Sequence, residues 1–388
     1  MVQNAPGFGL YVHWPFCQSK CPYCDFNSHA VDTINQNDWQ RALLQELDWA
    51  VERFDGSRNN APTVTSIFFG GGTPSLMPPE TTASIIQRIG EHFSVAPNLE
   101  ITLEANPSST ETARFESFRQ AGVNRLSLGI QAFNDRDLKF LGRTHDHKQA
   151  LKAIETAAKI FDRYSFDLIY ARPDQTPEQW GEELTYALEY AGEHLSLYQL
   201  TIEPGTAFAR DGVPAAHEKI GEPLYLMTQD IMQGAGLPAY EISNHARPGA
   251  ECRHNLTYWR GGEYLGIGPG AHGRLNTPSG WQAHHRIHNP AKWMEMVKTE
   301  GHGTAKQTPI SAADRRDEAV LSGLRLQQGI SATNFKKACG LDLKTAFNPR
   351  TVDILVKGGF LELENDGIKV TDEGRLRLDA VIEKLLND

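Results

Sequence analysis

The sequence has few cysteines, and their number is odd: five among 388 residues. Three of them lie close together, at Cys17, Cys21 and Cys24, and the other two are far along the chain. This count does not fit a framework of paired disulfides. Clustered thiols in a reducing compartment more often hold a metal or take part in redox chemistry. We therefore expect the function to centre on this cluster.

Long apolar runs are also absent. No stretch approaches the roughly 20 consecutive apolar residues of a membrane-spanning helix. The first residues, MVQNAP, contain neither the basic region nor the apolar region of a secretory signal. We expect a cytoplasmic protein without a membrane span, which leaves peripheral docking on a membrane open.

Positive charge is in the minority. The chain has 38 Lys and Arg against 48 Asp and Glu, a formal net charge of −10, which is the opposite of what a surface that follows nucleic-acid phosphates needs. With 40% hydrophobic and 22% charged residues, the composition is typical of a globular protein. We expect no nucleic-acid partner, and the length predicts a large body with a smaller second domain.

Apolar and β-branched runs alternate with amphipathic stretches over residues 1–240, the first predicted domain. The predicted strands are 10–14, 66–69, 99–104, 125–131, 166–170 and 195–202, and the predicted helices are 38–53, 79–93, 110–121, 146–160, 177–191 and 219–236. Consecutive βα units imply a parallel sheet with right-handed crossovers. We favour a partial (β/α)6 barrel of the TIM type, because the glycines and unusual polar residues follow the strands, where such barrels build their sites.

The rest of the chain has a different texture. Residues 241–310 are rich in Gly, Pro, His and aromatics with weak periodicity, and we expect an irregular bridging segment. Residues 311–388 predict helices and a hairpin around Asn365-Asp366-Gly367, which together suggest a smaller, winged-helix-like domain. This segment has 12 basic and 13 acidic residues, which argues against a DNA-reading role.

The cysteine cluster follows the first predicted strand with the spacing Cys17-x3-Cys21-x2-Cys24. Thiolates this close together can converge on one centre, and all-thiolate ligation suits iron–sulfur clusters or zinc. A zinc site completed by His29, or inert buried thiols, are the alternatives. A [4Fe–4S] cluster held by these cysteines would leave one iron without a protein ligand.

This spacing, with an aromatic residue before the last cysteine, resembles the signature of the radical S-adenosylmethionine (SAM) superfamily. The resemblance implies that the open iron binds the amino and carboxylate groups of SAM. It also implies that the reduced cluster cleaves SAM to a 5′-deoxyadenosyl radical, using an electron from a partner donor.

Further residues fall at the ends of successive predicted strands. The run Gly70-Gly71-Gly72-Thr73 lacks Cβ atoms that would keep a ligand away from the backbone, and it resembles the superfamily's motif for the SAM amino group. By the same resemblance to oxygen-independent coproporphyrinogen III oxidases and their relatives, the SAM site would comprise Tyr11, Gly71, Gly72, Thr73, Glu104, Gln131, Arg143 and Asp167. One departure affects the fifth strand, which relatives follow with Gly-Leu-Pro and this chain with Ala171-Arg172-Pro173.

Two features indicate which branch of the family the chain resembles. The oxidases carry a fourth cysteine where this chain has Phe26, and the run Cys24-Asp25-Phe26-Asn27-Ser28 resembles HemW-type haem chaperones. The run from His254 to Trp259 matches that branch's His-Asn-x-x-Tyr-Trp motif, which implies a haem contact at His254.

From the residues alone, His254 fits either an axial ligand among aromatic planes or a core histidine. Cys252 is a second possible ligand. We expect His284, His285 and His288 in a solvated loop.

The resulting hypothesis is a haem chaperone that binds haem, a [4Fe–4S] cluster and SAM, and passes haem to an acceptor protein. The alternative is an enzyme, an oxygen-independent coproporphyrinogen III oxidase. Whether the chain catalyses a reaction is left open at this stage.

Overall fold

The computed structural model describes residues 5–52, 62–216 and 218–387. Within them, an eleven-stranded sheet has the order β13-β12-β11-β10-β1-β4-β5-β6-β7-β8-β9. The run from β1 to β8 is parallel and contains the strands predicted from the sequence. Their bounds are β1 Phe8–Trp14, β4 Val64–Gly71, β5 Val95–Ala105, β6 Arg125–Gln131, β7 Arg163–Tyr170 and β8 His194–Gln199.

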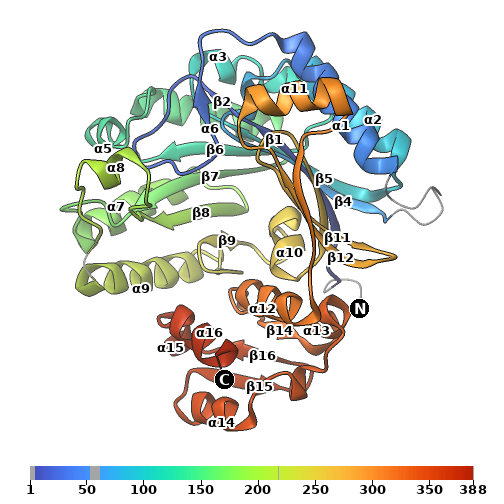
Figure 1. Ribbon diagram of the computed structural model, residues 1–388. Coiled ribbons are helices and arrows are strands. Elements are labelled where there is room, and N and C mark those ends of the chain that lie inside the picture. Colours follow the sequence, from blue (N-terminus) through green and yellow to red (C-terminus); the bar gives the residue numbers. More distant parts are fainter. Residues whose placement is uncertain (1–4, 53–61, 217, 388) are drawn as a thin grey trace.

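The predicted helices form the crossovers between these strands, and they cover the outer face of the curved sheet (Figure 1). They are α1 Gln36–Glu52, α2 Pro79–His92, α6 His147–Ile160, α7 Pro177–Leu188 and α9 Glu218–Gly234. The stretch 110–121 is two short helices, α3 Ser109–Thr112 and α4 Phe115–Gln120, rather than one. The α/β partial barrel expected from the sequence is therefore confirmed.

Short elements follow the strand ends at the edge where the site lies. They are β2 Phe16–Cys17, β3 His29–Ala30, the 3-10 turn η1 Pro74–Leu76, α5 Asp135–Phe140 and α8 Ala207–Arg210. Strands β2 and β3 pair with each other and enclose the cysteine loop between them.

The expectation of irregular structure in residues 241–310 is wrong. This segment contains β9 Asn244–Ala246, α10 Arg253–Trp259, β10 Glu263–Ile267, β11 His272–Thr277, β12 Gly280–Arg286, α11 Pro290–Glu300 and β13 Thr304–Pro309. Strand β10 adds in parallel to β1, and β11 to β13 extend the sheet as an antiparallel meander. Glycine obscured the strand pattern because the backbones approach closely: a Cβ on Gly266 would lie 2.1 Å from the backbone oxygen of His272.

The C-terminal part packs around a hydrophobic cluster of its own. It contains α12 Ala312–Gly323, β14 Ile330–Ser331, α13 Ala332–Cys339, the 3-10 turn η2 Leu343–Thr345, α14 Pro349–Lys357, β15 Leu361–Glu364, β16 Gly367–Val370, α15 Asp372–Arg375 and α16 Leu378–Leu386. The predicted hairpin is confirmed as the pair β15 and β16, which β14 joins in a small sheet. Figure 1 shows this domain below the main sheet, beside α10. The domain limits at 240 and 310 stay predictions.

None of the helices in the described ranges has the length and apolar character needed to cross a membrane.

Candidate functional site

The three cysteines of the loop after β1 line one cavity of about 150 Å³. The same cavity is lined by seven of the eight residues predicted to surround SAM, namely Gly71, Gly72, Thr73, Glu104, Gln131, Arg143 and Asp167. They come from the ends of consecutive parallel strands or from the loops after them. The strand order therefore brings together residues that are up to 150 positions apart in the chain.

Each cysteine sulfur has a polar neighbour. Thr73 Oγ1 lies 3.4 Å from Cys17 Sγ, Arg143 Nη1 lies 3.3 Å from Cys21 Sγ, and Ser28 Oγ lies 3.6 Å from Cys24 Sγ. Donors at these positions stabilise thiolates, the form that binds iron. Burial raises the pKa of the Cys17 thiol, so metal binding there would displace a proton. The donor set fits a thiolate-bound cluster.

A site for a single metal ion would need several ligand side chains that converge on one point. Over residues 5–52, 62–216 and 218–387, no three His, Cys, Asp or Glu side chains converge as ligands for one ion.

The glycine run at the end of β4 brings backbone against the cysteine loop. Gly71 has φ +114°, and a Cβ there would lie 2.6 Å from His13 Cε1. A Cβ on Gly72 would lie 2.6 Å from the backbone oxygen of Phe16. The Gly71 N–H donates to Glu104 Oε2 at 3.2 Å, which fixes that carboxylate at the cavity wall. No larger residue fits either position without displacing this backbone.

Two carboxyl groups face the cavity with raised pKa values. Burial, followed by the negative charge of Asp167, raises the pKa of Glu104 from 4.5 to about 8. Burial raises the pKa of Asp167 to about 6. An ammonium group or ribose hydroxyls would relieve this desolvation by hydrogen bonding to the charged form.

The side chain of Gln131, at the end of β6, is buried, and its backbone has φ +72°. A non-glycine residue in this left-handed region is held there by its surroundings.

A second, larger cavity of about 600 Å³ adjoins the first and shares Phe26, Gly71 and Glu104 with it. Tyr11, the remaining predicted SAM neighbour, lines this second cavity. The cavity lies between the β1 to β11 side of the sheet, α10 and α12, and its other lining residues are His13, Asn27, Tyr258, Trp259, Gly262, Tyr264, Gly270, His272, Arg274, His288, Arg315, Glu318, Leu321 and Ser322.

His254 lies behind the wall of this cavity and lines neither of the two. It is 1% exposed, its Nδ1 lies 2.9 Å from Ser66 Oγ, and its Nε2 lies 2.6 Å from the Tyr258 hydroxyl. Burial lowers the pKa of His254 to about 3, so the ring is neutral at physiological pH. Tyr258 and Trp259 of the same motif do line the cavity.

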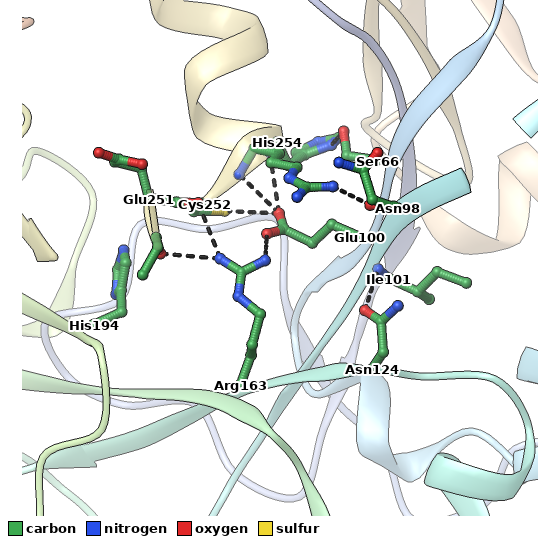
Figure 2. Close-up of polar contacts among 12 residues, drawn as sticks. Ser66, Asn98, Glu100, Ile101, Asn124, Arg163, His194, Glu251, Cys252 and His254 are labelled. Atoms are coloured by element: carbon green, nitrogen blue, oxygen red, sulfur yellow. Dashed lines mark hydrogen bonds and ion pairs between the residues drawn. The ribbon is translucent and has the colours of Figure 1, made fainter. Parts of the chain in front are cut away.

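Figure 2 shows how the start of α10 is held. The side chain of Glu100 in β5 is fully buried, pairs with Arg163 at 2.5 Å and accepts hydrogen bonds from the backbone N–H groups of Arg253 and His254. The Cys252 thiol donates to the same carboxylate at 3.5 Å, and burial raises its pKa to about 12. This buried network fixes the helix that carries the motif.

The expectation of a solvated loop is corrected for two of its three histidines. His284 and His285 lie on β12 rather than in a loop, because that strand pairs on both sides within the sheet. Arg172 does not line either cavity. Its buried guanidinium contacts the carboxylates of Asp137 and Glu183 instead.

The sequence reasoning missed several residues of the two cavities. Asn106 lines the first and donates to Thr73 Oγ1 at 3.1 Å, and its position two residues after Glu104 was the available signal. His272, Arg274 and Arg315 line the second cavity. No local pattern identified them, since they meet only through the sheet extension and α12.

Comparison with known proteins agrees with this geometry. The radical SAM superfamily model matches residues 11–187, and the HemN C-terminal domain model matches residues 310–377. The coproporphyrinogen III oxidase HemN of Escherichia coli has the same fold, with a TM-score of 0.80 over 99% of this chain and 91% of that one, at 23% identity. The fold and the cysteine cavity thus define a radical SAM protein.

Relatives that match over nearly their full length identify the family within the radical SAM proteins. The heme chaperone HemW of Haemophilus influenzae is 36% identical over 100% of both chains, and that of Escherichia coli is 35% identical over 98% of both. The mitochondrial radical S-adenosyl methionine domain-containing protein 1 of Bos taurus is 37% identical over 99% of this chain and 89% of its own length. The chain belongs to the HemW family of haem chaperones.

Proposed function

We propose that this protein binds a [4Fe–4S] cluster, SAM and haem, and that it transfers haem to an acceptor protein. The observation that carries the proposal is the pair of adjoining cavities, one with three cysteines and one of about 600 Å³. The larger volume suits a ligand the size of a porphyrin, and its walls include the planar side chains of Tyr258, Trp259 and Tyr264. Relatives named heme chaperones at 34–36% identity support haem as the cargo.

In the first cavity, Cys17, Cys21 and Cys24 would hold the cluster, which when bound supplies a low-potential electron for cleavage of SAM. Glu104 and Asp167 would accept hydrogen bonds from the ammonium group and the ribose hydroxyls of SAM. Gly71 and Gly72 let the backbone approach the ligand, and Tyr11 lines the adjoining second cavity.

The second candidate function is the oxidative decarboxylation of coproporphyrinogen III. It is considered because the chain shares its fold with HemN. Phe26 argues against it. This side chain stands where the oxidases have a cysteine, is 60% exposed, and lines both cavities.

The test uses the anaerobically reconstituted protein with SAM and dithionite. Haem titration should give a saturable Soret band. The haem-loaded protein should transfer haem to apomyoglobin faster than haem-loaded albumin does. Incubation with coproporphyrinogen III should give no protoporphyrinogen. Turnover to protoporphyrinogen without stable haem binding would overturn the chaperone assignment.

A further inference from the structure

Two histidines that line the second cavity lie outside the His-Asn-x-x-Tyr-Trp motif. His272, at the start of β11, and His288, just after β12, both line it. Their ring centroids are 6.3 Å apart, with the ring planes at 90°. His285, opposite His272 in the strand pair, stacks on the His272 ring at 4.2 Å and supports it from the side.

The histidines near the cavity differ in whether their ring nitrogens already have hydrogen-bond partners. Both nitrogens of His254 have partners, in Ser66 and Tyr258. Those of His13, which also lines the cavity, lie 3.0 Å from the Tyr11 hydroxyl and 2.9 Å from the backbone oxygen of Asn27. The described residues offer no hydrogen-bond partner to the rings of His272 and His288, which are exposed at the cavity.

The charges beside these histidines suit an anionic ligand. Glu318 lies between Arg274 and Arg315, at 2.9 Å from each, so the three side chains carry one net positive charge. All three line the cavity. In a chain with a net charge of −10, this local excess of positive charge favours the carboxylates of a ligand.

Apolar side chains complete the rim. Phe26 and Leu321 are 60% and 51% exposed, and both line this cavity. Exposed apolar side chains beside planar aromatic ones fit the faces of a macrocycle.

From these juxtapositions we propose that the imidazoles of His272 and His288 are axial ligands of haem iron in the second cavity, with Arg274 facing the propionates. The inference rests on the proposed function and specifies its binding site. His254 then acts as a positioning residue that holds Tyr258 in the cavity wall. Ligation forms an iron–nitrogen bond from the lone pair of a neutral imidazole and changes no oxidation state.

The experiment compares two porphyrins, because iron ligation and porphyrin packing separate only when iron is removed. Ferric haem is titrated by its Soret band, and iron-free protoporphyrin IX by its fluorescence, into reconstituted wild type, His272→Ala/His288→Ala, Arg274→Gln and His92→Ala. His92 is a matched control, since it lies on α2 and lines neither cavity. Iron and sulfide content confirms that each variant keeps its cluster.

The double histidine variant should bind haem at least tenfold more weakly and lose the wild-type Soret position, while its affinity for protoporphyrin IX stays within twofold. Arg274→Gln should weaken both porphyrins, and His92→Ala neither.

An unchanged haem spectrum and affinity in the double variant would overturn the inference and leave the chaperone function standing. Equal losses for both porphyrins would also overturn it, because packing rather than ligation would then be the cause. Wild type that binds no haem would instead contradict the proposed function itself. If the double variant loses its cluster, His272→Gln/His288→Gln, which preserves side-chain volume, gives the same comparison.

Discussion

Arg143 Nη1 lies 3.3 Å from Cys21 Sγ, and Nη2 of the same guanidinium donates to the backbone oxygen of Gly129 at 2.8 Å. This second contact, together with one to Asn106, ties Arg143, in the loop after α5, to the strand ends of the barrel. A fixed positive charge therefore sits beside one of the proposed cluster ligands.

Replacing Arg143 by Gln should leave cluster assembly intact but make the reduction potential of the cluster more negative. The reason is that the reduced cluster carries more negative charge and loses a neighbouring cation. Redox titration monitored by electron paramagnetic resonance (EPR) measures the shift. The exposed Arg136→Gln is the control and should leave the potential unchanged. Equal potentials in wild type and Arg143→Gln would refute this role.

Gly71→Ala should destabilise the protein by about 1–3 kcal/mol, because an alanine at φ +114° is strained and its Cβ would lie 2.8 Å from the backbone oxygen of Trp14. Gly90→Ala in α2 is the control: apart from its chain neighbours and the backbone of its own helix, no atom lies within 4 Å of the added Cβ. That change should stabilise by roughly 0.5–1 kcal/mol. Urea unfolding measures both, and equal effects of the two substitutions would show that the close approach at Gly71 does not matter.

The pKa of Glu104 predicts a pH dependence. The folded pKa of about 8 lies above the ordinary 4.5, so the folded chain binds the extra proton between these values. The contribution of Glu104 to the stability of the ligand-free protein is present below about pH 4.5 and is lost as pH rises towards 8, with a slope of up to ~1.4 kcal/mol per pH unit. Glu104→Gln should flatten this part of the profile in chemical denaturation. A profile as steep as that of wild type would exclude Glu104 as its source.

Glu100→Ala should cost about 3–5 kcal/mol, because it leaves Arg163 without its carboxylate and frees the N–H groups at the start of α10. Glu116→Ala, on an exposed position of α4, should change stability by less than about 0.5 kcal/mol. Thermal unfolding tests both. A loss below 1 kcal/mol in Glu100→Ala would mean that this network does not hold the motif helix.

Several parts of this structure could be predicted from local patterns, because the determining contacts are local. Strand β6 matches its predicted range, and Thr176-Pro177 begins α7 through a capping box. Cys17, Cys21 and Cys24 lie within eight residues of one another, so their place around one cavity could be predicted without knowledge of the fold.

Other parts depend on contacts that no local pattern encodes. Strands β10 and β11 were missed because Gly266 and Gly273 serve close backbone approach rather than an alternating apolar pattern. The position of His254 behind the cavity follows from its contact with Ser66, 188 residues away. The cavity histidine His272 and Arg315 of α12 come together only when the C-terminal domain docks on the sheet.

Metal and sulfide analysis of the anaerobically reconstituted protein, combined with EPR of the reduced sample before and after adding SAM, tests the central claim most directly. We predict about four iron and four sulfide per chain, a signal that changes when SAM is added, and loss of both in a Cys21→Ala variant that remains folded. Colourless protein that holds only zinc, or a Cys21→Ala variant with the iron and sulfide content of wild type, would contradict the account.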